Sequence, residues 1–375
     1  MDQTSTISDN ISEILSQFLI GEVNSIVPYG TGHINETYFV KSVNANDTDY
    51  LLQRINHHIF KNVSVLIKNI LTVTAHLRKK LEAVAGANPD QEVLTLVSTR
   101  NGEYYYHDSK GDYWRMYYFL DANSYDILEN QQQAYQGGRA FGKFQCQLVD
   151  LNVNLIQETI PNFHNVQLRY NRFEQVLQGD KANSRAQNTT AEIAFVRERA
   201  ENMVQAWQKL LQLPVRVIHN DTKFNNVLLN KDDRVQCVID LDTVMPGYVA
   251  YDFGDAIRTI INTAAEDERD LDKINLNIPF FESYTQGYLE EAASFLTDEE
   301  AESLLTGVYL ITYEQIVRFL TDYLENDVYY KIHFPEHNLQ RTQAQIELLK
   351  KLEASGDELL KIIKGIIKKD KLISN

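Results

Sequence analysis

The chain has 375 residues, of which 43% are hydrophobic, and this is enough for two domains with cores of their own. Its formal charge of −16 disfavours nucleic acid or an anionic membrane surface as a partner, because both carry charge of the same sign. The two cysteines suggest neither a disulfide framework nor a zinc site, and no apolar run approaches the length of a membrane span. The amino terminus lacks the pattern of a signal peptide, so we expect a cytoplasmic protein. We also expect a monomer.

The first 120 residues predict a small, β-rich lobe. A short amphipathic helix is predicted at 8–19 and a longer helix at 62–84. Strands are predicted at 23–28, 34–43, 50–55, 92–99, 103–107 and 113–119. The first two strands flank the turn Gly30-Thr31-Gly32, and glycines there would allow backbone N–H groups to approach phosphates. We therefore expect this turn to cover a nucleotide.

Two further nucleotide contacts are expected from this lobe. Many kinases carry a phosphate-anchoring lysine on the strand that corresponds to residues 50–55, but the only cation in this strand is Arg54. We assign Arg54 to the nucleotide site, although strand alternation alone does not show on which face it lies. Residues 117–120 would form the hinge between lobes, with the backbone at Tyr118 and Leu120 contacting the adenine. The aromatic side chains of this segment are also typical of a sheet core.

After residue 120 the chain becomes mostly helical, which predicts a second, larger lobe at 121–375. Apolar stripes at helical spacing predict helices at 132–149, 191–213, 252–261, 305–324 and 340–367, the last interrupted near residue 355. Residues 183–190 are polar and predict a loop. The helix that contains Arg318 has apolar residues on both sides of it, so this arginine requires a partner, either in a structural ion pair or in a substrate.

The strongest functional signal lies at residues 215–242. Two short apolar runs flank a polar turn with the pattern His219-x-Asp221-x₄-Asn226, and a third run ends at Asp240, nineteen residues after Asp221. In kinases, an aspartate at the first position orients the acceptor hydroxyl, and the asparagine and later aspartate bind Mg²⁺ on the nucleotide phosphates. A polar surface turn is the alternative, but such turns seldom hold these four residues at this spacing between buried strands.

The triplet Asp252-Phe253-Gly254 has the same letters as the metal-binding triplet of protein kinases. It lies thirty-one residues after Asp221, which is too far for that role, and it coincides with the start of a predicted helix. We interpret Asp252 as a buried acid that accepts hydrogen bonds from the catalytic loop, because carboxylates are favoured at helix amino termini. His219 is interpreted in the same way, as a structural anchor of that loop.

Three motifs resemble the aminoglycoside phosphotransferase family of small-molecule kinases. They are residues 219–226 (HNDTKFNN), 238–247 (VIDLDTVMPG) and 251–255 (YDFGD). Within this family the segments 30–38 (GTGHINETY) and 52–58 (LQRINHH) most resemble the N-acetylhexosamine 1-kinases, and the resemblance extends from about residue 27 to residue 330. It implies an α+β, bilobal, protein-kinase-like fold with a β-rich amino-terminal lobe and a mostly helical carboxy-terminal lobe.

The resemblance also implies an activity: transfer of phosphate from ATP, with Mg²⁺, to the anomeric C1 hydroxyl of an N-acetylhexosamine. Asp221 and Lys223 would be catalytic, and Asn226 and Asp240 would hold the metal. His33, Asp242, Arg318 and Tyr329 would join Asp221 in contacting the sugar, although Asp242 could instead support the metal.

Two alternatives remain open from the sequence. The acceptor could be another alcohol, such as choline, homoserine or an aminoglycoside, because the wider family covers all of these. A nucleotide-binding pseudokinase scaffold would explain the missing strand lysine. The presence of Asp221, Asn226 and Asp240 argues against a scaffold, which needs neither the base nor both metal ligands.

Overall fold

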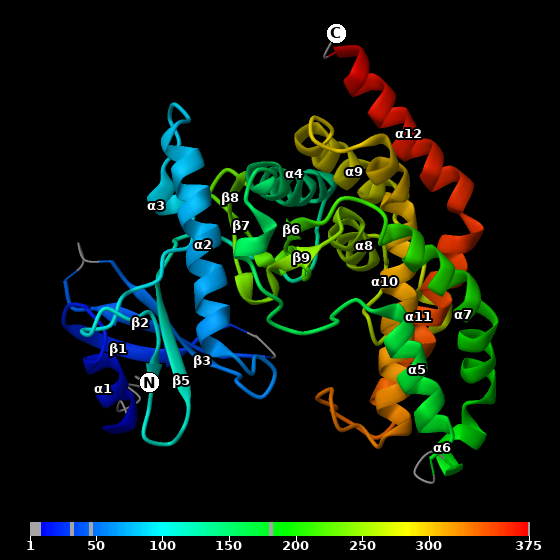
Figure 1. Ribbon diagram of the computed structural model, residues 1–375, viewed down its shortest axis with the longest axis horizontal. Helices are drawn as coiled ribbons and strands as arrows, with labels where there is room; N and C mark the ends of the chain where they lie inside the picture. Colours follow the sequence, from blue (N-terminus) through cyan, green and yellow to red (C-terminus); the bar gives the residue numbers. More distant parts are fainter. Residues whose placement is uncertain (1–8, 31–33, 45–47, 180–182, 374–375) are drawn as a thin grey trace.

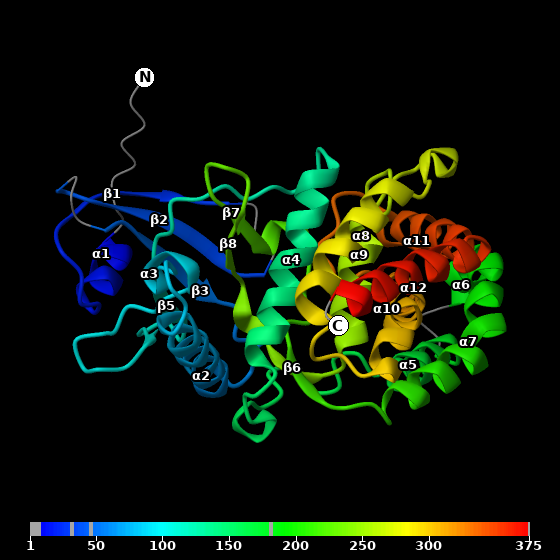
Figure 2. The ribbon, with the colours of Figure 1, turned by 90° about the horizontal axis from the view of Figure 1, so that it is seen from above.

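The computed structural model of the chain describes residues 9–30, 34–44, 48–179 and 183–373. A β-sheet lobe at the amino-terminal end packs beside a larger region built almost entirely from helices (Figure 1). Seen from above, the sheet and α2 form one side of the molecule, and α5, α7, α10, α11 and α12 form the other (Figure 2). This arrangement confirms the predicted α+β, kinase-like fold. The division at residue 120 stays a prediction.

The amino-terminal lobe is an antiparallel sheet with the strand order β1-β2-β3-β5-β4. Its strands are β1 (Val23–Pro28), β2 (Glu36–Ser42), β3 (Tyr50–Ile55), β4 (Tyr106–His107) and β5 (Tyr113–Tyr118). Side chains alternate between the two faces of a strand, and both faces are covered. One face packs with α1 (Asp9–Ser16), and the other packs with α2 (Val63–Glu82).

Two of the predicted strands are wrong or too long. In the strand predicted at 92–99, Glu92 ends the short helix α3 (Pro89–Glu92), and residues 93–99 form only isolated bridges, one of them between Leu96 and Tyr117 of β5. The apolar residues of this segment are buried against the sheet, which explains the strand-like pattern, but they do not form a continuous ladder. The strand predicted at 103–107 shortens to β4.

The carboxy-terminal region is organised around long helices. They are α4 (Gln131–Leu148), α5 (Val166–Leu177), α6 (Asn183–Asn188), α7 (Thr190–Leu210), α8 (Val249–Ile260), α9 (Ile278–Ala292), α10 (Asp298–Leu324), α11 (His337–Ala354) and α12 (Gly356–Ile373). The predicted interruption near residue 355 is confirmed, since α11 ends at Ala354 and α12 begins at Gly356. The loop predicted at 183–190 is wrong, because α6 occupies most of it.

Two small, two-stranded sheets carry the candidate catalytic residues. β6 (Arg216–Ile218) pairs with β9 (Met245–Gly247), and β7 (Val227–Leu229) pairs with β8 (Val235–Val238). One buried apolar cluster includes Leu66 of α2, Phe144 of α4, Leu228 of β7 and Cys237 of β8. The two lobes therefore share a core at the position where the catalytic strands lie. None of the helices in the described part of the chain is long and apolar enough to span a membrane.

The helices around α8 approach one another so closely that glycine is required at the crossing. A Cβ added to Gly307 of α10 would lie 1.9 Å from the carbonyl oxygen of Ala250 in α8. A Cβ added to Gly254 of α8 would lie 2.4 Å from the carbonyl oxygen of Gly307. The backbones of α8 and α10 are thus in direct contact, which fixes α8, and the acids of its first two turns, against the core.

We expect Gly307→Ala to lower the melting temperature, because the added methyl group forces α8 and α10 apart at a cost of about 1–3 kcal/mol, as is typical of overpacking. Gly365 of α12 is a matched control, since a Cβ there meets nothing within 4 Å. Gly365→Ala should leave the melting temperature unchanged or raise it, because alanine is the better helix former. Equal melting temperatures for the two variants, measured by calorimetry, would contradict this account of the crossing.

Candidate active site

The connection between β6 and β7 contains His219, Asp221 and Asn226, and its shape is set by Asp252 in the first turn of α8. The Asp252 carboxylate accepts the backbone N–H of His219 at 2.9 Å and that of Asn220 at 2.7 Å. It also accepts a hydrogen bond from the side-chain amide of Gln145 on α4, whose Nε2 lies 2.8 Å away. The interpretation of Asp252 as a buried acid that supports the catalytic loop is therefore confirmed.

His219 and Asn220 complete this support. The His219 side chain is fully buried, and its Nε2 lies 2.9 Å from the carbonyl oxygen of Ile239, beside the strand end that carries Asp240. Asn220 has a φ of 66°, in the left-handed region, which asparagine tolerates better than most residues. Its Nδ2 donates to the carbonyl of Thr243 at 3.0 Å. The loop is thus fixed from both sides, and His219 is its anchor, as predicted.

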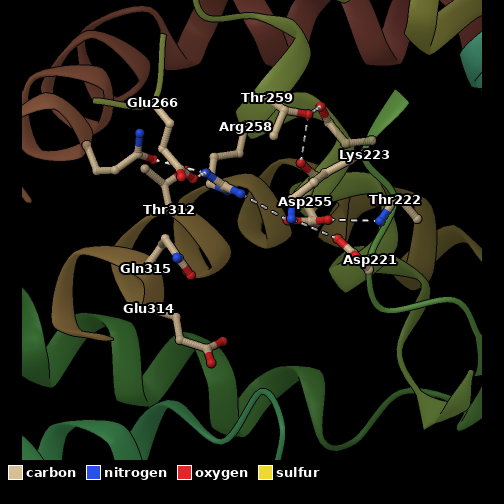
Figure 3. Close-up of polar contacts among 12 residues, drawn as sticks. Asp221, Thr222, Lys223, Asp255, Arg258, Thr259, Glu266, Thr312, Glu314 and Gln315 are labelled. Carbon is tan, nitrogen blue, oxygen red and sulfur yellow. Dashed lines mark hydrogen bonds and ion pairs between the residues drawn. The ribbon is translucent and has the colours of Figure 1, made fainter. Parts of the chain in front are cut away.

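Asp221 and Lys223 form an ion pair at 3.3 Å between Oδ1 and Nζ. Burial, the largest single effect, raises the pKa of the Asp221 carboxyl, but the charge and hydrogen bond of Lys223, together with other nearby groups such as Arg258, outweigh burial and hold the pKa below its ordinary value. The charge of Asp221 in turn raises the pKa of Lys223. Both groups are therefore charged at neutral pH. In Figure 3 they lie beside Thr222, whose backbone N–H begins a set of polar contacts that continues through Asp255 and Arg258 to Glu266.

The geometry of Asn226 and Asp240 fits a divalent cation. The Nδ2 of Asn226 donates to the carbonyl of Asp221 at 2.9 Å, and the backbone carbonyl of Asn226 accepts the N–H of Ile239 at 2.9 Å. These contacts place Asn226 beside Asp240. In the described part of the chain the Asp240 carboxylate has no hydrogen-bond or ion-pair partner, and burial with the charges of Asp242 and Asp221 raises its pKa to about 7.

Such a carboxylate, together with an amide oxygen, is the kind of ligand set with which proteins hold Mg²⁺ alongside nucleotide phosphates. The site depends on the nucleotide for further ligands. Among the described residues, no group of three or more His, Cys, Asp or Glu side chains is arranged to hold a metal alone.

Asp242 lies two residues further on and is bound differently. Both of its carboxylate oxygens accept hydrogen bonds from the guanidinium of Arg115 on β5, and Oδ2 also accepts Nδ2 of Asn35 at 2.7 Å. Its exposed fraction is only 2%. Asp242, predicted to contact the sugar or to support the metal, is thus held by residues of the amino-terminal lobe.

Arg54, assigned from the sequence to the nucleotide site, lies on the other face of the sheet. It forms ion pairs with Glu36 of β2 and with Asp112, the latter at 3.2 Å. Because neighbouring side chains of a strand point to opposite faces, Gln53 takes the inward position, and its Oε1 accepts Nε of Arg115 at 2.9 Å. The structure therefore places Arg115, and not Arg54, beside the acids of the catalytic strands.

The other predicted nucleotide contacts are partly described. Gly30, the first residue of the expected nucleotide-covering turn, has a φ of 74°, a conformation that favours glycine. Thr31, Gly32 and His33 lie outside the described residues. At the hinge, the N–H of Tyr118 donates to the carbonyl of Thr95 at 3.0 Å. Within the described chain the N–H of Leu120 has no acceptor, so Leu120 retains the free backbone donor that an adenine contact requires.

Arg318 of α10 lies among aromatic and polar side chains. Its guanidinium is 5.7 Å from the ring centroid of Phe163, 5.9 Å from that of Tyr329 and 5.5 Å from that of Tyr330. It also donates to Oε1 of Gln315 at 3.1 Å. Burial, the dominant effect, lowers the pKa of Arg318, but the neighbouring Tyr330 and Glu314 more than compensate and raise it.

Three residues of this group, Arg318, Tyr329 and Tyr330, line a cavity of about 350 Å³ between α5 and α10. Figure 3 shows Gln315 and Glu314 of α10 apart from Asp221, with no contact drawn between them. Burial chiefly raises the pKa of Tyr330, and the charge of Glu266 adds to this effect. Burial acts against the lowering of the pKa of Glu266, which Arg258 and then Lys223 bring about, so the two regions are close enough to interact electrostatically. The structure thus brings the predicted residues Arg318 and Tyr329 to the same side of the molecule as Asp221.

Sequence reasoning missed three residues of this region. Arg258 of α8 forms ion pairs with Asp255 at 3.4 Å and with Glu266 at 2.7 Å, and Asp255 accepts the N–H of Thr222 at 2.8 Å. A cavity of about 390 Å³ opens beside Lys223, Arg258 and Glu266. The sequence did contain a signal for the Asp255–Arg258 pair. Asp255 belongs to the motif 251–255, and Arg258 follows three residues later, on the same face of the predicted helix.

Comparison with known proteins agrees with this geometry. A profile of the family described as "Phosphotransferase enzyme family" (APH) matches residues 25–293. The chain belongs to this family. It is a phosphotransferase with the kinase-like fold of the APH family.

Solved structures with the same fold include several kinases of small molecules. An amicoumacin kinase in complex with AMP-PNP and Ca²⁺ has a TM-score of 0.61 at 12% identity, covering 92% of this chain and 94% of the other. An aminoglycoside phosphotransferase from Alicyclobacillus acidocaldarius has a TM-score of 0.61 at 10% identity, covering 98% of each chain. Plasmodium vivax ethanolamine kinase has a TM-score of 0.55 at 15% identity, covering 90% of this chain and 84% of the other. At these identities the likeness concerns the fold.

We expect Asp252→Asn to loosen the catalytic loop of this phosphotransferase. An amide offers one acceptor oxygen, and its NH₂ group would face a backbone N–H, leaving a buried donor unsatisfied at a cost of about 1–3 kcal/mol. The amides of His219 and Asn220 should exchange faster with deuterium, and the melting temperature should fall. Asp232→Asn, in the exposed β7–β8 turn, is the control and should change neither quantity. Unchanged exchange at His219 and Asn220 in Asp252→Asn would refute the supporting role.

We expect Asp240→Asn to abolish most metal-dependent turnover, because the substitution removes the charged ligand and keeps its shape. The loss should be on the order of 100-fold or more, since even the outer partners of metal ligands contribute roughly 10–100-fold. The melting temperature should not fall, because the Asp240 carboxylate has no partner among the described residues to lose. Full activity of the wild-type enzyme in excess chelator would contradict the metal assignment.

Proposed function

We propose that this chain is an ATP- and Mg²⁺-dependent kinase that phosphorylates the anomeric C1 hydroxyl of an N-acetylhexosamine, GlcNAc or GalNAc. One observation carries the kinase part of the proposal. The charged pair Asp221–Lys223 and the ligand pair Asn226–Asp240 lie on adjacent turns that are fixed by Asp252 and His219. This is the set of groups that phosphoryl transfer requires from a protein, namely positioning and charge neutralisation.

The roles of the chain's own residues follow from their charge and position. Asp221 is anionic at neutral pH and accepts a hydrogen bond from the acceptor hydroxyl, which orients the oxygen for attack. Lys223, held beside Asp221, neutralises negative charge on the phosphoryl group during transfer. Asn226 and Asp240 would hold Mg²⁺, which when bound with ATP offsets the charge of the phosphates. The Leu120 N–H and the turn after Gly30 would contact the nucleotide.

An anomeric hydroxyl suits a base of this kind. The ring oxygen withdraws electrons from C1, so the C1 hydroxyl is more acidic than an ordinary alcohol. A carboxylate with a lowered pKa is a weak base, and it suffices when its main contribution is to orient the hydroxyl. The lowered pKa keeps the Asp221 carboxylate charged, so that it can orient the hydroxyl that the ring oxygen makes more acidic.

The acceptor side favours a neutral polyol over a cationic alcohol. Aromatic rings recognise a quaternary ammonium group by surrounding it. Here the rings of Phe163, Tyr329 and Tyr330 already face the guanidinium of Arg318, so they are not free to surround a cationic substrate. The nearby carboxylates are also paired within the chain, Glu314 with His164 at 2.8 Å and Glu266 with Arg258 at 2.7 Å. An arginine and tyrosines suit sugar hydroxyls, to which they donate hydrogen bonds.

Turnover measured as ADP release with a panel of acceptors tests the proposal. GlcNAc or GalNAc should be the best acceptor, and choline, ethanolamine, homoserine and an aminoglycoside should be poor ones. The methyl glycoside of GlcNAc, blocked at O1, should not turn over, while a 6-deoxy analogue with O1 free should. Phosphorylation of the methyl glycoside would refute the anomeric assignment, and preferred turnover of an amine would leave only the broader kinase function.

A further inference from the structure

Arg115 is a charged side chain that the sequence gives no reason to place in the interior. It lies on β5, and only 1% of it is exposed. Burying a guanidinium costs several kcal/mol unless its donors are satisfied by an anion in good geometry. Here Nη1 and Nη2 both donate to the Asp242 carboxylate, and Nε donates to Gln53 at 2.9 Å. The pair is bidentate, which is the strongest arrangement for an arginine and a carboxylate.

This ion pair joins the two lobes. Arg115 and Gln53 are directly opposite one another on the adjacent strands β5 and β3 of the amino-terminal sheet. Asp242 lies between β8 and β9, in the catalytic segment. The backbone carbonyl of Asp242 is fixed as well, since it accepts Oγ1 of Thr159 at 2.8 Å. The contact between the lobes at this point is therefore a buried and fully hydrogen-bonded charge pair.

Asn35 extends the connection toward the turn after Gly30. Its Nδ2 donates to Oδ2 of Asp242 at 2.7 Å, and its Oδ1 accepts the N–H of Asn56 at 3.0 Å. Asn35 lies just before β2, so the backbone at the start of this strand is attached to Asp242 through Asn35. One carboxylate thereby holds both the sheet, through Arg115, and the segment at Asn35.

The same carboxylate lies two residues from Asp240. The guanidinium of Arg115 is close enough for its charge to act on Asp240 as well as on Asp242. The strand where many kinases carry a phosphate-anchoring lysine has no lysine here, and its inward-facing Gln53 binds Arg115. A cation on the next strand thus takes the place beside the catalytic acids.

We propose that Arg115 and Asp242 form an interlobe pin, a pair of positioning residues that holds the segment around Asn35 and the ligand Asp240 in register for a metal-bound nucleoside triphosphate. The nucleotide part of this inference rests on the proposed function. The pin acts on nucleotide binding and leaves recognition of the acceptor to other residues. It also assigns Asp242 to the structure of the nucleotide site, because both of its oxygens are engaged by Arg115 and Asn35.

A buried ion pair could also serve stability alone, and the chain contains a control for that case. Arg216 of β6 binds Glu300 of α10 in the same bidentate way, with Nε–Oε1 at 2.5 Å and Nη2–Oε2 at 2.9 Å. Glu300 is 1% exposed. This second pair lies within the helical region and touches neither Asn35 nor Asp240. Its removal should therefore affect stability without affecting nucleotide binding.

The experiment compares Arg115→Met, Asp242→Asn, the double variant and the control Arg216→Met in the full-length protein. The first readout is hydrogen exchange of the Asn56 amide without any ligand, because this amide is protected through Asn35. The second is the dissociation constant of ADP with Mg²⁺, from calorimetry at a temperature where each variant is folded. A third variant, Arg115→Lys, retains the charge and keeps the test interpretable if the methionine variant folds poorly.

We expect exchange at Asn56 to accelerate in Arg115→Met and in Asp242→Asn but not in Arg216→Met. ADP affinity should fall about tenfold in Arg115→Met, within the range found for residues coupled in one network, and Arg115→Lys should recover part of it. The double variant should bind ADP no more weakly than Arg115→Met, since the two residues act as a unit. Arg216→Met should lower the melting temperature and keep its ADP affinity within about twofold of wild type.

Unchanged exchange at Asn56 in Arg115→Met would overturn the pin. Unchanged ADP affinity in Arg115→Met, with a lower melting temperature like that of Arg216→Met, would reduce the pair to a stabilising contact and overturn the positioning role. Wild-type protein that binds no ADP would instead overturn the proposed function and the nucleotide part of this inference, while the exchange data would still decide whether the pin exists.

Discussion

The geometry of the candidate site depends on one buried carboxylate, that of Asp252. Two consecutive backbone N–H groups, of His219 and Asn220, donate to it, and this contact forces the chain to turn just before Asp221. The carboxylate can do so only because α8 is held rigidly by α10, where Gly254 and Gly307 allow the two backbones to touch. The position of a loop residue is thus determined by the packing of two helices that are distant from it in the sequence.

A second constraint acts from the amino-terminal lobe. The shared apolar core and the Arg115–Asp242 pair join the sheet to the catalytic strands, so the two lobes meet through both hydrophobic and charged contacts. The first gives most of the stability, because burial of apolar surface is the dominant favourable contribution to folding. The second gives direction, because a bidentate ion pair has a defined geometry. Together they place the residues expected to hold nucleotide and metal on facing surfaces.

The local part of the site was predictable from the sequence, and the long-range part was not. Spacing alone identified residues 219–226 and Asp240, because these residues lie on one loop and on the adjoining strand end. It also separated Asp252 from the metal ligands. Arg115 could not be found in this way, since its partner lies 127 positions away in the sequence. Arg54 was chosen because it is the only cation in its strand, and the sheet register shows that Gln53 faces Arg115.

The same distinction applies to the fold. Strands β1 and β3 were predicted to the residue. The segment at 92–99 has a similar composition but lies against the sheet without a continuous ladder, and composition does not reveal pairing. Helix α5 was missed because its sequence is largely polar and buries only Val166, Phe173 and Val176. Sequence patterns indicate which side chains of a segment are buried. Which other segment it packs against depends on the fold of the whole chain.

The most direct test of the account is to determine the position of the phosphate in the product. A proton–phosphorus NMR correlation on the reaction of ATP, Mg²⁺ and GlcNAc should join the new phosphorus signal to the anomeric proton H1. The same reaction with Asp221→Asn should give little or no such product, because the hydroxyl is no longer oriented by a charged group. A correlation to the C6 protons, or release of inorganic phosphate without any phosphorylated sugar, would contradict the account.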